Sequence, residues 1–160
     1  MEIKITKVSL EHLKTPPSTL SGVEFGTVFT DHMFCMEWDD REGWHSAQIK
    51  PYGPLSLEPS SMVLHYAQMS FEGLKAYKVQ SGEYALFRPR ENFKRMNRTA
   101  QRMCLPELDV DDVLDALKQL LNLDSGWVPD EDGTSLYVRP VILATEEAIG
   151  LKVSSKYLFF

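Results

Sequence analysis

The chain is organised around the segment HYAQMSFEGLKAYK, residues 65–78. This stretch follows a short segment of helical pattern, which begins at Ser60, and leads into an apolar and aromatic segment that is interrupted at Glu72-Gly73. Tyr66 and Phe71 lie close to this glycine, and a glycine within a strand often marks a place where the backbone approaches a ligand. Aromatic side chains beside a strand usually pack in a core, so this stretch alone favours a structural role.

A second stretch, SLYVRP at residues 135–140, suggests a site. Strand alternation places Tyr137 and Arg139 together on one face, with Leu136 and Val138 on the other. Because Arg139 has valines on both sides, we expect it to be partly buried and to need an anionic partner. That partner could be a structural glutamate, or the carboxylate or phosphate of a ligand. We interpret the two stretches as the walls of one pocket.

The rest of the chain alternates between strand and helix patterns. Strands are expected at 28–38 and 44–52, as a hairpin around the turn 39–43, and at 74–79 and 84–87, as a hairpin closed by Ser81-Gly82. Further strands are expected at 135–145, with Pro140 at an edge or bulge, and at 157–160. Apolar residues at helical spacing predict helices over 89–104 and from about Asp109 to Leu121. Glu146 to Leu151 is expected to be a loop.

Composition excludes several classes of protein. The chain has 160 residues, 43% of them hydrophobic and 25% charged, which is enough for one domain with a modest core. A formal net charge of −6 disfavours nucleic acid and anionic membranes as partners. No membrane-span pattern or signal-peptide pattern is found. Cys35 and Cys104 lack metal-ligand spacing with the histidines, so we expect reduced core thiols, a cytoplasmic protein and no metal site.

The basic residues provide the remaining candidates. Arg95, Arg98 and Arg102 form a stripe at helical spacing. A solvated helix face is the default interpretation, but a member of the stripe that points inward could bind a phosphate. Lys75 lies close to the central stretch, although a lysine on a strand usually extends outward. No pair of a nucleophile and a general base is found. Arginines for anionic groups and an aromatic pocket without a catalytic group indicate that the chain contributes only half of an active site.

Four motifs in order resemble the branched-chain amino acid aminotransferases, which are pyridoxal-phosphate enzymes of fold type IV. They are FTDHM (29–33), HYAQMSFEGLKAYK (65–78), LFRPRENFKRMNRTAQRMCLP (86–106) and SLYVRP (135–140). The resemblance implies an α+β fold, with a mostly antiparallel sheet and two helices packed on it. It implies a lead segment at 1–20 and the family's N-terminal small domain at 21–160. The C-terminal domain, with the Schiff-base lysine, is not within these residues, so no catalytic residue is expected here and the chain alone is expected to be inactive.

The resemblance also assigns roles to residues. Arg95 matches the arginine that binds the phosphate of pyridoxal 5'-phosphate, and Tyr137 and Arg139 match the pair that flanks the substrate. The aromatic residues of the hydrophobic side-chain pocket correspond to Phe25, Tyr66 and Phe71. Ile149 and Leu151 match a loop that, together with the Tyr66 position, reaches the active site of the other subunit of a homodimer.

The implied reaction transfers the amino group of leucine, isoleucine or valine to 2-oxoglutarate, as in branched-chain amino acid biosynthesis. The alternatives are another enzyme of fold type IV (a D-amino acid aminotransferase or an aminodeoxychorismate lyase) and a non-catalytic module that binds a ligand or partner.

Overall fold

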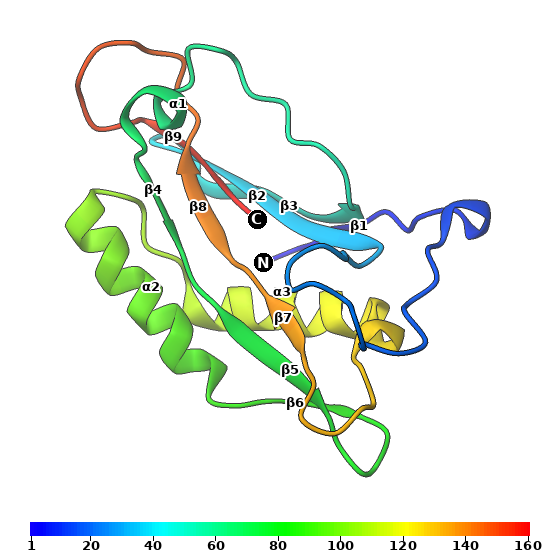
Figure 1. The fold of residues 1–160 in the computed structure, drawn as a ribbon. Helices are drawn as coiled ribbons and strands as arrows, with labels where there is room; N and C mark the ends of the chain where they lie inside the picture. Colours follow the sequence, from blue (N-terminus) through cyan, green and yellow to red (C-terminus); the bar gives the residue numbers. More distant parts are fainter.

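Two long antiparallel segments form the centre of the fold and run side by side (Figure 1). The computed structural model describes residues 1–160. One segment contains β4 (Met69–Phe71) and β5 (Leu74–Lys78), and the other contains β7 (Leu136–Val138) and β8 (Val141–Ala144). β4 pairs with β8, and β5 pairs with β7, in the same register. The two segments therefore remain aligned where both leave one sheet for the other.

These segments join a six-stranded sheet to a three-stranded sheet. The strand orders are β1-β3-β2-β9-β8-β4 and β6-β5-β7. The remaining strands are β1 (Lys4–Ile5), β2 (His32–Asp39), β3 (Gly43–Pro51), β6 (Tyr84–Leu86) and β9 (Lys156–Phe159). All pairs are antiparallel except β1 with β3. The α+β class with a mostly antiparallel sheet is thus confirmed.

Two long helices cover the sheets. α2 (Pro89–Met103) packs against β4, and α3 (Val110–Leu123) packs against β2. α2 begins with a proline, which is tolerated where the first N–H has no helical partner. The Asp109 side chain caps α3 by accepting hydrogen bonds from two backbone N–H groups, at 2.9 and 3.0 Å. The shorter helices are α1 (Met62–Tyr66), η1 (Leu10–His12) and η2 (Ser125–Trp127).

Both helices and both hairpins match the sequence-based predictions, but two expectations are wrong. The strand expected at 135–145 is two strands in different sheets, because Pro140 has no N–H to continue the ladder. Of the two expected core thiols, Cys35 is buried but Cys104 is exposed. Cys104 ends α2 in a left-handed conformation, which carries its side chain away from the core.

The crossing between sheets is formed by Glu72-Gly73 and Arg139-Pro140. The backbone N–H of Glu72 donates to the Pro140 carbonyl at 2.9 Å. Alternation continues through the crossing: Ser70, Glu72, Leu74 and Ala76 are buried, whereas Met69, Phe71 and Lys75 are exposed. Glu72 therefore points its carboxylate to the buried face of the segment.

Gly73 leaves room for the ring of Tyr137. A Cβ atom at Gly73 would overlap the Tyr137 hydroxyl oxygen and lie 2.9 Å from Cζ of that ring. Its φ is not in the left-handed region, so glycine is required here by the close approach rather than by the backbone conformation.

We expect Gly73→Ala to lower the free energy of unfolding by about 1–3 kcal/mol, because the new methyl group must displace the tyrosine. Denaturant unfolding of the purified protein measures this change. Gly53→Ala is the matched control, since nothing lies within 4 Å of its Cβ position. In a Tyr137→Ala background the cost of Gly73→Ala should largely disappear. An equal cost with and without Tyr137 would mean that the close approach does not explain this glycine.

Candidate functional site

One cluster gathers four of the candidate residues. The Arg139 guanidinium carbon lies 4.3 Å from the centre of the Phe71 ring. The same guanidinium donates to the Tyr137 hydroxyl from Nη2 at 2.9 Å and from Nε at 3.3 Å. Phe25, from the N-terminal loop, meets the Tyr137 ring edge to face with 5.1 Å between ring centres. Three distant segments thus contribute to one cluster, in which the Arg139 guanidinium lies against the Phe71 and Tyr137 rings, an arrangement that is favourable for an arginine.

The expectation that Arg139 is partly buried is wrong, and no structural glutamate pairs with it; the other expected partner, an anionic group of a ligand, stays a prediction. Arg139 is exposed, and its partners are two aromatic rings and a hydroxyl group rather than a carboxylate. Alternation along the strand correctly placed Arg139 and Tyr137 on the same face, but that face is the open one. The positive charge is therefore available to an external anion.

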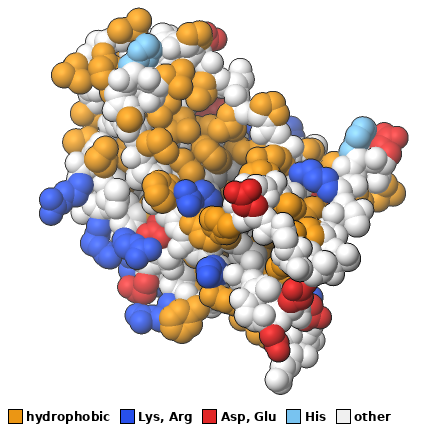
Figure 2. All heavy atoms as spheres, in the orientation of Figure 1, with side chains coloured by type: hydrophobic (Ala, Val, Ile, Leu, Met, Phe, Trp, Pro, Cys, Tyr) orange, Lys and Arg blue, Asp and Glu red, His pale blue; other side chains and the backbone are white.

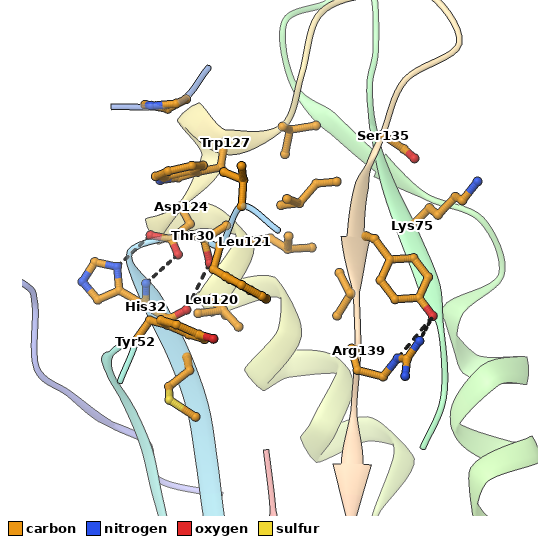
Figure 3. Close-up of a pocket in the computed structure, with 18 of the residues that line it drawn as sticks. Thr30, His32, Tyr52, Lys75, Leu120, Leu121, Asp124, Trp127, Ser135 and Arg139 are labelled. Atoms are coloured by element: carbon orange, nitrogen blue, oxygen red, sulfur yellow. Dashed lines mark hydrogen bonds and ion pairs between the residues drawn. The ribbon is translucent and has the colours of Figure 1, made fainter. Parts of the chain in front are cut away.

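A cavity of about 1240 Å³ lies beside this cluster. Phe25, Lys75, Tyr137 and Arg139 belong to its wall. More than half of the lining residues are hydrophobic, and those from α3 include Leu117, Leu120 and Leu121. Figure 3 shows Lys75, Ser135 and Arg139 on one side of the cavity, across from Leu120, Leu121 and Trp127. An apolar cavity with cations on one side suits a ligand with an aliphatic part and an anionic end.

The far wall contains a buried polar pair that the sequence did not indicate. His32 Nδ1 lies 2.7 Å from Asp124 Oδ1, and the His32 backbone N–H donates to Asp124 Oδ2 at 3.0 Å (Figure 3). The backbone N–H of Val8 donates to His32 Nε2 at 2.9 Å. The ring therefore accepts at Nε2 and donates from Nδ1. With both nitrogens engaged inside the protein, this pair serves to join the N-terminal segment, β2 and the end of α3.

Arg95 forms an ion pair with Glu72. Its Nε donates to Glu72 Oε1, and its Nη2 donates to Glu72 Oε2 at 2.8 Å. The Glu72 side chain is 5% exposed, whereas that of Arg95 is 61% exposed. Arg98 and Arg102 are exposed and have no ion-pair partner. Arg98 and Arg102 thus lie on a solvated helix face, as expected, whereas the Arg95 side chain turns toward Glu72 at the end of β4.

The surroundings of Glu72 favour its charged form. Burial raises the pKa of Glu72, but hydrogen bonds from Arg95, the Gly73 N–H and Asn92 outweigh burial, and the pKa is lowered from 4.5. The same pair raises the pKa of Arg95. Because folding lowers the carboxyl pKa, its stabilising effect is present above about pH 4.5 and is lost as the pH falls through the lowered value.

The guanidinium of Arg95 also fits an anion. Glu72 engages Nε and Nη2, and no protein group engages Nη1. Since arginine binds phosphate through N–H groups on one edge of its plane, Arg95 has donors left for such a group. Arg95 does not line the cavity; it lies beside β4, an edge strand, next to the crossing between the sheets.

A third group contains Tyr66 and Ile149. The Tyr66 hydroxyl donates to the Ile149 carbonyl, which joins α1 to the loop after β8. Leu151, in the same loop, is 87% exposed. Figure 2 shows hydrophobic side chains gathered on this part of the surface, and the exposed ones include Leu64, Met69 and Val153. The structure does not place Tyr66, Ile149 or Leu151 in the wall of the cavity.

No group of three or more histidine, cysteine, aspartate or glutamate side chains is arranged to bind a metal ion. None of the helices combines the length and the apolar character that crossing a membrane requires.

Comparisons with known proteins identify relatives of the chain. No family model matches it. It is 52% identical over 146 residues to branched-chain-amino-acid transaminase 1 of Bacillus subtilis (strain 168), a match that covers 91% of this chain and 40% of the relative. The chain thus spans about two fifths of the length of the curated relatives it matches.

Solved structures share the fold. The branched-chain aminotransferase of Thermoproteus uzoniensis with norvaline has a TM-score of 0.58 at 20% identity, over 81% of this chain and 40% of that one. The T.th. branched-chain amino acid aminotransferase complexed with N-(5'-phosphopyridoxyl)-L-glutamate has a TM-score of 0.55 at 21% identity, over 78% and 39% of the two chains. With its fold shared by these enzymes and about half of its residues identical to a transaminase, the chain belongs to the branched-chain aminotransferase family.

Proposed function

We propose that the chain is the small domain, residues 21–160 with a lead segment at 1–20, of a pyridoxal-phosphate-dependent branched-chain aminotransferase. The complete protein transfers the amino group of leucine, isoleucine or valine to 2-oxoglutarate. The observation that carries this proposal is the exposed Arg139 guanidinium, held on Phe71 and Tyr137 beside a largely apolar cavity. Among small molecules, this arrangement favours one that combines a carboxylate with an aliphatic side chain.

The proposed substrate contacts follow from this geometry. Arg139 and Tyr137 bind the anionic part of the amino acid or 2-oxo acid. Because Tyr137 accepts its hydrogen bonds from Arg139, its own hydroxyl hydrogen is free to be donated to an oxygen of the substrate. Phe25, which lines the cavity, contacts the branched side chain, whose full burial contributes about 1.5–3 kcal/mol. Phe71, which is not part of the cavity wall and lies against Arg139, is assigned to the same contact by the family resemblance. These contacts exclude water from one side of the substrate and orient it.

Arg95 is the proposed phosphate ligand of the cofactor. Its guanidinium has donors left beside the Glu72 contact, and one solved structure of the same fold contains a phosphopyridoxyl compound. When bound, pyridoxal phosphate supplies the electron sink for transamination. The lysine that acts as base and covalent partner of the cofactor is proposed to lie in the remainder of the protein.

We further propose a cytoplasmic homodimer that serves in branched-chain amino acid biosynthesis. Two unpaired cysteines are typical of proteins in reducing compartments. A net charge of −6 supports small molecules, rather than nucleic acid or an anionic membrane surface, as the partners. The exposed apolar residues Tyr66, Ile149 and Leu151 support a contact with a second subunit, since an exposed apolar surface is typical of a protein–protein interface.

The proposed activity is tested with the complete protein and pyridoxal phosphate. We expect turnover of leucine with 2-oxoglutarate, followed through glutamate formation, and much slower turnover of D-alanine. Preference for D-alanine, or formation of 4-aminobenzoate from aminodeoxychorismate, would assign the protein to a different fold type IV activity. Binding of the cofactor without any turnover would support a non-catalytic module and contradict the proposal.

Arg139→Gln should raise the KM for leucine by about 10–150-fold, as expected for loss of a charge-assisted contact of roughly 1.5–3 kcal/mol. The affinity for pyridoxal phosphate, measured by titration of the apoprotein, should change little. Arg98→Gln, which removes an exposed arginine without an ion-pair partner, is the control. Loss of cofactor affinity with an unchanged KM would show that the roles of Arg95 and Arg139 are exchanged.

If Tyr66 serves the site of the neighbouring subunit, two inactive variants should complement one another. In a mixed dimer of a Tyr66→Ala chain with a chain lacking the cofactor-binding lysine, one site has an intact lysine and receives an intact Tyr66. Activity should therefore reappear, up to half of the sites in each mixed dimer. Mixed dimers no more active than the Tyr66→Ala parent would place Tyr66 in its own subunit's site.

A further inference from the structure

We propose that Glu72 is a positioning residue for the phosphate-binding Arg95: its carboxylate holds the Nε–Nη2 edge of the guanidinium and leaves the Nη1 donors turned toward the anion. This inference rests on the proposed function, because it assigns the phosphate contact to Arg95. It adds a residue that touches neither substrate nor cofactor and acts through another side chain.

The placement of Glu72 is unusual for a charged residue. It lies on the buried face of the β4–β5 segment, between Ser70 and Leu74, and is 5% exposed. A buried carboxylate is retained only with strong hydrogen-bond partners. Glu72 has three besides Arg95 Nε: Arg95 Nη2 at 2.8 Å, the Gly73 N–H at 2.9 Å and Asn92 Nδ2 at 3.2 Å. The carboxylate is thus fixed to the backbone at the crossing between the sheets.

This fixed carboxylate restricts a side chain that would otherwise be mobile. Arg95 extends from the exposed side of α2, and long side chains on such faces populate many rotamers. The two-point contact through Nε and Nη2 sets the plane of its guanidinium as well as its position. Nη1, which has no protein partner, lies on the edge that remains for a ligand. A group held in this way before binding loses less entropy when the anion arrives.

The neighbouring arginines provide an internal comparison. Arg98 and Arg102 are also exposed on the same helix but have no carboxylate partner. Asn92, one turn before Arg95, bonds both the Glu72 carboxylate and the Gly73 carbonyl, the latter at 3.1 Å. Two successive turns of α2 are therefore tied to the crossing at the point where Arg95 leaves the helix.

The test measures phosphate-specific binding to the apo form of the complete protein. Spectroscopic titration measures the affinity for pyridoxal phosphate and the affinity for pyridoxal, which lacks the phosphate. The ratio of the first affinity to the second isolates the contribution of the phosphate contact. Arg95→Ala should lower this ratio by about 10–150-fold. Glu72→Gln should lower it by roughly 10-fold, as for other residues that orient a binding group. Arg98→Ala should leave it unchanged.

The double variant separates positioning from a general structural effect. If Glu72 acts through Arg95, Glu72→Gln should change the ratio no further in an Arg95→Ala background. The positioning role would be overturned if Glu72→Gln lowered the affinity ratio equally with and without Arg95. It would also be overturned if Glu72→Gln lowered the affinities for pyridoxal and for pyridoxal phosphate by the same factor. An unchanged ratio for Arg95→Ala itself would instead refute the phosphate assignment in the proposed function.

Arg95→Lys covers the case in which Glu72→Gln fails to fold. It keeps the positive charge and the carboxylate but replaces the two-point contact with a single ammonium group. We expect the ratio to fall in this variant too, because a lysine is not held in one plane by Glu72. A ratio equal to that of the unchanged protein would show that charge alone is sufficient, and would overturn the inference.

Discussion

The common pairing register of residues 69–76 with residues 136–143 fixes which side chains meet at the crossing between the sheets. Because the register does not shift between β4–β8 and β5–β7, the residues at the crossing stay opposite one another. Gly73 thereby faces Arg139, and Glu72 faces Pro140. A shift by one residue would exchange the two faces of one segment relative to the other. It would separate Phe71 from Arg139 and turn Glu72 away from Arg95.

The crossing is possible because Pro140 has no backbone N–H and Gly73 has no side chain. Pro140 cannot donate to the ladder, so the sheet is interrupted on that strand and the chain can change sheets. Gly73 has no side chain on the open face, so the Tyr137 ring can lie against the backbone. The open face of the crossing consequently presents aromatic rings and Arg139, while its closed face holds the Glu72 carboxylate. The backbone of one strand separates the two proposed anion-binding arginines.

The sequence was informative where periodicity alone decides the structure. Apolar spacing predicted α2 and α3, and turn residues predicted both hairpins, because these features depend on neighbours close in the chain. Alternation placed Tyr137 and Arg139 together, but it could not tell which face would be covered, and so the expected burial of Arg139 was wrong. The pairs Glu72–Arg95 and His32–Asp124 join residues 23 and 92 positions apart, and no local pattern links them. The placement of Glu72 between Ser70 and Leu74 was the only signal that its carboxylate turns toward the core.

The strand orders have a consequence for association between chains. The outer strands of both sheets are β1, β4, β6 and β7, and none has more than three residues. A sheet edge recruits another chain through a row of unpaired N–H and C=O groups, and edges this short offer few of them. The longest strand, β3, is covered on its outer side only where β1 pairs with Gln48 and Ile49, so residues 43–47 of β3 have no strand neighbour on that side. Any extension of the larger sheet by another chain would therefore begin along this part of β3 rather than at the short outer strands.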